Sequence, residues 1–224
     1  MCNSGLRLLP LVLLIAAAPV ADPVRDRIVA EAAASSAAAI AFDRMTKSVR
    51  KGGGSTTTVN IVERWDGKSW KLISYNGRAP TASQRRSHEK QAQDAPVPGY
   101  HRLGILVAAA TSSNADAQGR TVLQIPVLPP NTVRTDSSDI SSHLRAEATL
   151  ARRGDQVWVQ RVRVTAREPF RMNMLIKVLS FEQVSEYLIG EDGKPRLAAQ
   201  TADSQGTMFG FPGGEKSQVT YVYR

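Results

Sequence analysis

The segment FRMNMLIKVLSF, residues 170–181, decides the predicted fold, because it places apolar side chains on both faces of one extended run. Alternate residues of a β-strand point to opposite faces of the sheet. One face would carry Phe170, Met172, Met174, Ile176 and Val178, and the other Leu175, Leu179 and Phe181. The run continues to Ile189 without Gly or Pro, well beyond the ~5–6 residues of a typical strand. We therefore expect a long, strongly twisted strand with apolar contacts on both sides.

Period-two patterns and turn dipeptides surround this segment and predict a sheet. Residues 56–65 and 69–75 flank Asp66-Gly67, and Asn76-Gly77 follows, so these runs predict a hairpin. Further strands are expected at 121–129, 144–150, 156–165, 170–189, 196–201 and 218–223. Turn residues separate them at Arg153-Gly154-Asp155, Glu168-Pro169, Glu191–Lys194 and Gly206–Gly214. Connections this short make successive strands antiparallel, because a parallel neighbour needs a long crossover.

Helical signals open the chain and interrupt the strands. Asp22 and Pro23 are typical of a helix start and the three glycines from Gly52 of a helix end, so one helix is expected over Pro23–Lys51. Its stripe of small and apolar residues would pack on a sheet. Further helices are expected at Thr81–Gln93, capped by Thr81, and at YHRLGILVAAAT, residues 100–111.

Together these elements predict the fold class α+β, mainly β. Its centre would be one large curved antiparallel sheet with helices on one side. The length that remains after residue 21 suits a single domain over residues 22–224.

The first 21 residues have the layout of a secretory signal peptide. Arg7 precedes an apolar run from Leu8 to Ala18, small residues follow, and cleavage is expected after Ala21. The run is shorter than the ~20 residues that a transmembrane helix needs. Cys2, the only cysteine, lies before the run rather than just after it, so we expect neither lipid anchoring nor a thiol in the mature chain. We therefore expect export to the periplasm.

The basic charge bears on the partners. The chain has 29 Lys and Arg residues against 20 Asp and Glu, a formal charge of +9, which falls to +8 when Arg7 leaves with the signal peptide. In an exported protein this charge favours an anionic membrane surface over nucleic acid, whereas scattered cations also serve solubility alone. Both interpretations stay open. We expect no nucleic acid partner, and we expect a monomer.

The sequence lacks the usual catalytic and metal-binding motifs. His88, His101 and His143 show no HExxH or HxH spacing, and no serine lies in a GxSxG motif. No GxxxxGKS/T or GxGxxG motif is present to hold phosphate, and the acidic pairs fall in turns, where no apolar cover would raise a pKa. We therefore expect a protein that is not an enzyme and that has no metal and no cofactor.

Two groups of residues are candidates for binding. Arg161, Arg163 and Arg171 flank the turn between two long strands, where they would hold phosphate or carboxylate groups; the alternative is a solvated rim. Apolar residues in excess of what one helix covers predict an apolar pocket, although ordinary core packing is the alternative. The candidate liners are Trp158, Phe170, Met172, Met174, Ile176, Met208 and Phe209.

The layout of the whole chain resembles a known superfamily. The exported start, the first helix, the hairpin WDGKSWKLISYNGRAP at 65–80, the strand pair over 156–189 and the ending QVTYVYR are similar to the half-barrel superfamily of periplasmic lipoprotein carriers, which includes LolA, LolB and the RseB sensor domain. The resemblance implies an incomplete antiparallel barrel, a half-barrel, whose concave apolar face is covered by helices and admits acyl chains. It also implies that the first helix is a lid or a plug at that face.

These observations lead to two hypotheses about function. The first is an exported, periplasmic, non-enzymatic protein that binds a lipid, a lipidated protein or another apolar ligand in a half-barrel cavity. The second is an envelope protein–protein interaction or sensor module without a small ligand. A continuous cavity beneath the first helix would favour the first hypothesis, and a filled interior the second.

Overall fold

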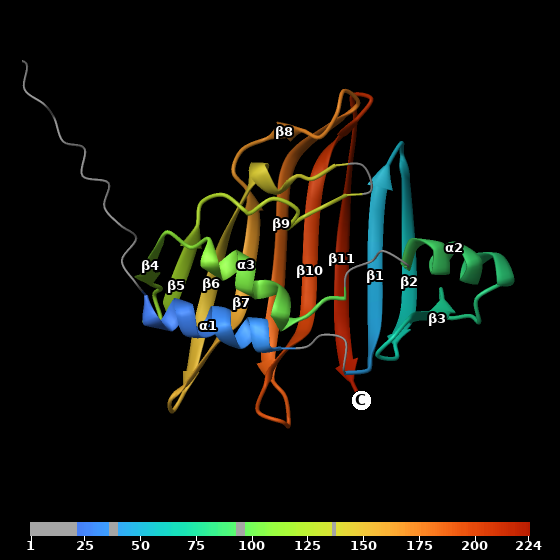
Figure 1. Ribbon diagram of the computed structural model, residues 1–224. Helices are drawn as coiled ribbons and strands as arrows, with labels where there is room; N and C mark the ends of the chain where they lie inside the picture. The colour runs from blue at the N-terminus through green and yellow to red at the C-terminus, as the bar shows by residue number, and fades with distance from the viewer. Residues whose placement is uncertain (1–21, 36–39, 93–96, 136–137) are drawn as a thin grey trace, which may run out of the picture.

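The computed structural model describes residues 22–35, 40–92, 97–135 and 138–224, so the predicted signal peptide lies outside the described residues. In these ranges, eleven strands form one antiparallel sheet (Figure 1). The strands are β1 (Phe42–Gly52), β2 (Ser55–Trp65), β3 (Trp70–Tyr75), β4 (Ser112–Ala115), β5 (Thr121–Ile125), β6 (Leu144–Arg153), β7 (Gln156–Ala166), β8 (Phe170–Arg171), β9 (Ile176–Ile189), β10 (Pro195–Met208) and β11 (Phe211–Tyr223).

The sheet is open rather than closed. Its strands follow the order β3-β2-β1-β11-β10-β9-β7-β6-β5-β4, and β8 pairs with β9 beside this path. The predicted fold class, a mainly β half-barrel with helices on its concave face, is confirmed. The hairpin predicted at Asp66-Gly67 is confirmed as β2 and β3, which pair in antiparallel register from Trp65 opposite Trp70.

The helices lie on one face of the sheet (Figure 1). They are α1 (Pro23–Ala34), α2 (Ala82–Ala92), α3 (Leu103–Ala108) and the short 3₁₀ turns η2 (Tyr100–Arg102) and η3 (Ser141–His143). α1 packs on α3 and on β7, and α2 packs on the edge strand β3. None of the helices in the described ranges is long and apolar enough to cross a bilayer.

The first predicted helix is wrong in its second half. α1 starts as expected, with the Asp22 carboxylate accepting the backbone N–H groups of Val24 and Arg25, but it ends at Ala34. Residues 42–52 instead form β1, paired along its whole length with β2 and β11. The glycines read as a helix end make the β1–β2 turn, with φ of +56° at Gly53 and +74° at Gly54. Two complete ladders of hydrogen bonds outweigh the weak helical pattern of this segment.

The segment 170–181 is not one long strand. Phe170 and Arg171 fold back on Val178 and Lys177, so the segment forms a tight hairpin, with β8 as one arm and the start of β9 as the other. The carboxamide oxygen of Asn173 accepts the backbone N–H groups of Leu175 and Ile176, each at 2.9 Å, and this local turn breaks the strand. The two-faced strand predicted for residues 170–181 is therefore replaced by a loop over 172–175 and a shorter strand.

The break predicted at Gly206–Gly214 is confirmed in position but is much shorter than expected, because β10 runs to Met208 and β11 begins at Phe211. Their connection is a two-residue turn at Phe209-Gly210, and Met208 pairs with Phe211. The glycines permit a close approach of the strands: a Cβ on Gly214 would lie 2.6 Å from the Ser204 carbonyl oxygen. Strand β4, at the far edge of the sheet, had no clear signal in the sequence.

The core fills the concave face beneath α1 and α3. Ile28 and Ala32 of α1 are fully buried, as are Val159 of β7 and Ala148 of β6. An aromatic group continues this core towards α2, with Phe42 edge-on to Trp70 at 5.4 Å between ring centroids. The helices and the aromatic group thus cover one end of the concave face.

A buried ionic cluster fixes α2 to the sheet. Glu63 of β2 accepts a hydrogen bond from Arg44 Nε at 2.7 Å and lies 2.6 Å from His88 Nε2 of α2. The Arg44 guanidinium also stacks over Trp70, 4.1 Å from the ring centroid. His88 therefore has a structural role, because it joins α2 to the sheet.

Candidate functional site

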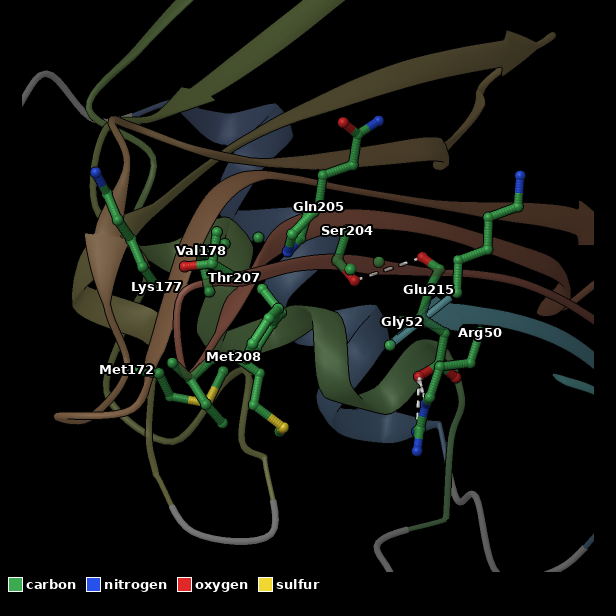
Figure 2. Close-up of a pocket in the computed structure, with 18 of the residues that line it drawn as sticks. Arg50, Gly52, Met172, Lys177, Val178, Ser204, Gln205, Thr207, Met208 and Glu215 are labelled. Atoms are coloured by element: carbon green, nitrogen blue, oxygen red, sulfur yellow. Dashed lines mark hydrogen bonds and ion pairs between the residues drawn. The ribbon is translucent and has the colours of Figure 1, made fainter. Parts of the chain in front are cut away.

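A groove of about 820 Å³ lies at the end of the sheet that α1 and α3 leave uncovered. The ends of β1 and β2, the β8–β9 hairpin and the β10–β11 hairpin line it, together with Thr135 and Ile140. Figure 2 shows Met172 and Met208 on one side of the groove and the Arg50–Glu215 ion pair on the other. The groove therefore has an apolar side and an ionic side.

The register of the strands builds the groove from three rows of residues. The row nearest the turns is apolar and places Ile176 opposite Met208, which itself faces Phe211. The next row consists mainly of glycine and runs Val178, Gly206, Gly213, Gly52. The third row becomes polar across the sheet and runs Phe181, Ser204, Glu215, Arg50, Thr57.

The glycine row makes the hollow. A Cβ on Gly213 would lie 2.9 Å from the Lys51 carbonyl oxygen, and one on Gly206 would overlap the carbonyl of Lys177. At Gly206 and Gly213, therefore, no side chain larger than hydrogen fits without a shift of the strands, and the floor of the groove stays low between the walls. A bulge between β9 and β10 at this level, at Gln205 and Gly206, further curves the sheet.

The ionic side of the groove holds an exposed pair. Nη2 and Nε of Arg50 donate to one Glu215 carboxylate oxygen at 2.8 and 3.0 Å, and the Arg50 side chain is 74% exposed. Exposed pairs of this kind stabilise a fold by only about 0–1 kcal/mol. An anionic group placed here would therefore compete with Glu215 for the Arg50 guanidinium at little cost to the fold.

The structure brings four of the predicted liners to this groove: Met172, Ile176, Met208 and Phe209. The Met172 sulfur also lies 3.8 Å from the Thr135 hydroxyl, which positions the thioether at the wall. The other three lie elsewhere: Phe170 is buried and stacks on His143 at 4.4 Å, Trp158 is half-buried against the core, and Met174 is 91% exposed at the hairpin tip.

The three predicted arginines do not form one site. Arg163 Nε donates to Glu182 at 2.8 Å, and this hydrogen bond raises the pKa of Arg163 and lowers that of Glu182. Arg161 faces Glu186 in the β7–β9 register, whereas Arg171 lies on the β8–β9 hairpin opposite Lys177. The alternative of a solvated and locally compensated rim therefore describes Arg161 and Arg163 better than an anion site does.

The cations beside the groove were missed from the sequence. Arg50, Lys51 and Lys177 line it, and the first two precede the glycines at 52–54 that we expected to end a helix. Two cations directly before a hairpin turn would have been the signal, had β1 been recognised as a strand. Among the described residues, no three His, Cys, Asp or Glu side chains gather in a way that would hold a metal ion.

Comparisons with known proteins leave the family of this chain open. No family model matches the chain, and no curated protein matches it. A solved structure of the ywiB protein from Bacillus subtilis matches with 7% identity and a TM-score of 0.19, over 81% of this chain and 94% of that one. A loop-deletion mutant of OmpT, an outer membrane protein of Vibrio cholerae, matches with 10% identity and a TM-score of 0.18, over 81% and 98%. Likenesses this low carry no argument about fold or function.

Proposed function

We propose that this chain is an exported periplasmic protein without enzymatic activity that binds the acyl chain of a lipid or a lipidated protein in the groove. The observation that carries the proposal is the three-row groove, whose outer row is apolar and whose floor is glycine. Ordinary core packing fills such space with side chains, whereas here large apolar residues border it and stay partly exposed. The resemblance of the sequence layout to half-barrel lipoprotein carriers supports the same function.

The chemistry of the walls suits an amphipathic ligand. Methionine side chains are flexible and polarisable, so Met172 and Met208 adapt to acyl chains of different length or saturation. Arg50, across the groove, offers two donors to a phosphate or carboxylate head group. The volume lies within the ~300–1,000 Å³ that is usual for small-molecule sites.

A fluorescent fatty acid titration tests the proposal, together with native mass spectrometry of protein purified without detergent. We expect saturable binding, and an acyl-containing mass that is lost after lipid extraction. Ile176→Gln and Met208→Gln should each weaken binding roughly tenfold, because each removes about 1.5 kcal/mol of apolar contact with the ligand.

Leu188→Gln is the matched control, because Leu188 is a 60% exposed apolar residue of the same strand, β9, and does not line the groove. It should bind the fatty acid as the unchanged protein does. A protein that is ligand-free after purification and shows no saturable binding would contradict the proposed function, as would an equal loss in the control.

A further inference from the structure

Three turns lie together at one end of the strands. They are the β1–β2 turn at Gly53-Gly54, the β8–β9 loop over 172–175 and the β10–β11 turn at Phe209-Gly210. The register holds them together, because Gly52 pairs with Gly213 and Met208 with Ile176. Figure 1 shows these turns at the upper ends of the strands, away from the C-terminus. We call this end of the sheet the tip surface. It consists of the three turns, the apolar residues Met174, Leu175, Met208, Phe209 and Phe211, and the cations Lys51, Arg171 and Lys177.

Large apolar side chains are exposed on the tip surface. Met174 is 91% exposed, Phe209 65% and Leu175 49%, and Met208 and Phe211 follow directly in the strands. Water makes such a cluster unfavourable, and soluble monomers rarely keep one without an interaction partner. Met174 is especially informative, because it lines no part of the groove and its contacts within the fold are few.

The backbone of Phe209 adds an independent observation. Its φ of +53° lies in the left-handed region, which a bulky aromatic residue adopts at a cost and which two-residue hairpin turns normally assign to Asn or Gly. The exposed ring gains little packing within the fold in return. Strain of this kind without a structural benefit points to a function outside the fold.

Cations surround the apolar turns. Lys51, Arg171 and Lys177 are exposed at the strand ends beside the three turns, whereas Glu215 is held by Arg50. The apolar side chains at the centre and the cations around them complement an anionic lipid bilayer, in which acyl chains lie beneath negatively charged head groups.

Four backbone N–H groups of the tip surface, those of Met172, Leu175, Ile176 and Phe209, are already hydrogen-bonded. The N–H of Met172 donates to the Ile176 carbonyl at 3.0 Å, and the N–H of Phe209 donates to that of Leu175 at 2.9 Å. Asn173 holds the N–H groups of Leu175 and Ile176 with its side chain. Entry into an apolar medium is costly for unpaired backbone groups, and these are paired. A peptide that adds a strand would need unpaired ones, so a bilayer fits better than a protein partner that binds by strand addition.

We propose that the tip surface docks on an anionic lipid bilayer. Met174, Leu175 and Phe209 enter the boundary between head groups and acyl chains, while Lys51, Arg171 and Lys177 contact the head groups. The groove opens between the same hairpins, so an acyl chain would pass between the bilayer and the groove without crossing water. Docking itself does not depend on the proposed function of the groove.

Vesicle flotation of the mature chain tests the docking. We expect the protein to float with vesicles of phosphatidylethanolamine and phosphatidylglycerol, to bind phosphatidylcholine vesicles much more weakly, and to be released by high salt. Lys51→Gln and Lys177→Gln should each lower the affinity about fivefold. Met174→Ser combined with Phe209→Asn should lower it about tenfold or more, since two apolar anchors are lost.

Ile105→Ser is the matched control, because Ile105 is a 71% exposed apolar residue on α3, outside the tip surface. It should float as the unchanged protein does. Failure of the unchanged protein to bind anionic vesicles, or an equal loss in the control, would overturn the docking. So would a dimer in light scattering that Met174→Ser dissociates, because a second copy would then cover the tips.

The two proposals fail separately. Ile176→Gln should weaken fatty acid binding in solution and leave flotation unchanged, because Ile176 lines the groove and is only partly exposed. Met174→Ser should do the reverse. A protein that floats but binds no fatty acid would leave the docking standing and contradict only the groove function.

Discussion

At the scale of single residues, Phe209 occupies a turn position that a bulky aromatic residue rarely adopts. The two-residue turn at Phe209-Gly210 needs a positive φ at both positions, +53° and +83° here. Asn-Gly satisfies this geometry with little strain, as Asn76-Gly77 does at φ of +50° and +76° elsewhere in the chain. The aromatic ring at position 209 is therefore better explained by contacts outside the fold than by the turn.

Phe209→Asn should stabilise the protein. Relief of the left-handed strain is worth about 1 kcal/mol, and in a domain of this size that raises Tm by about 2–4 °C. Thermal unfolding followed by circular dichroism measures the change. Phe211→Asn is the control: Phe211 is similarly exposed, but it lies in β11 and has no positive φ, so its Tm should not rise. A lower Tm for Phe209→Asn would show that the ring packs usefully in the fold.

Glu63 is the second residue whose environment has a measurable consequence. Burial alone raises the pKa of its carboxyl group, but the hydrogen bonds and charges of Arg44 and His88 outweigh burial and hold the pKa below its ordinary value of 4.5. Below about pH 4.5, the unfolded chain therefore binds a proton at Glu63 more readily than the folded protein does. The stability from this carboxylate is complete above that pH and is lost as the pH falls.

The free energy of unfolding should thus decrease on acidification partly through Glu63. Urea unfolding at a series of pH values below neutral measures this dependence. Glu63→Gln should cost about 3 kcal/mol at neutral pH, because Arg44 loses its buried partner. The variant should also show a weaker pH dependence than the unchanged protein. Parallel curves for the two proteins would mean that Glu63 does not carry the effect.

At the scale of elements, local patterns predicted some parts and pairing decided the others. The Asp66-Gly67 hairpin and the helix capped by Thr81 could be predicted because their signals are local; the Thr81 hydroxyl accepts the N–H of Gln84 at 3.2 Å. β1 could not be predicted, because its partner β11 is distant in sequence. Its other partner, β2, follows glycines that are typical of a helix end as well as of a hairpin turn. The hairpin at 170–181 depends on one Asn173 turn that the apolar alternation concealed.

The candidate site was predictable only in its apolar half. Met172, Ile176, Met208 and Phe209 stood out by type and reached the groove, whereas Met174 and Phe170 shared the same pattern and did not. The difference depends on the position of the turn between β8 and β9, which the alternation of apolar and polar residues does not predict. The ionic half was missed because Arg50 was assigned to a helix rather than to the strand that faces Glu215.

The glycine row gives an element-scale test. Gly206→Ala should destabilise the protein by about 1–3 kcal/mol, because its Cβ would overlap the Lys177 carbonyl and push β9 from β10. Gly104→Ala is the control: it lies in α3, its Cβ would meet Ala32 at an ordinary 3.6 Å, and helix propensity favours Ala. Chemical denaturation of both variants measures the difference, and a stable Gly206→Ala protein would show that the strands can separate there without cost.

At the scale of the whole molecule, the open sheet divides into a filled part and a hollow end. α1 and α3 cover the filled part, where Ile28 and Ala32 are fully buried, so of the two expected roles, lid or plug, the packing of α1 corresponds to a plug. The hollow end carries the groove, the exposed apolar turns and the surrounding cations. This division is the physical basis for proposing one end for ligand and bilayer and the other for stability.

The most direct test of the central claim maps a bound acyl chain on the protein. A fatty acid with a photoreactive diazirine on its chain is bound to the protein without residues 1–21 and cross-linked by light, and the modified peptides are identified by mass spectrometry. Adducts should concentrate in the segments 172–181 and 204–213, which supply most of the residues that line the groove, and an excess of unlabelled fatty acid should suppress them. Adducts spread evenly over the chain, or gathered in α1 and α3, would contradict the account.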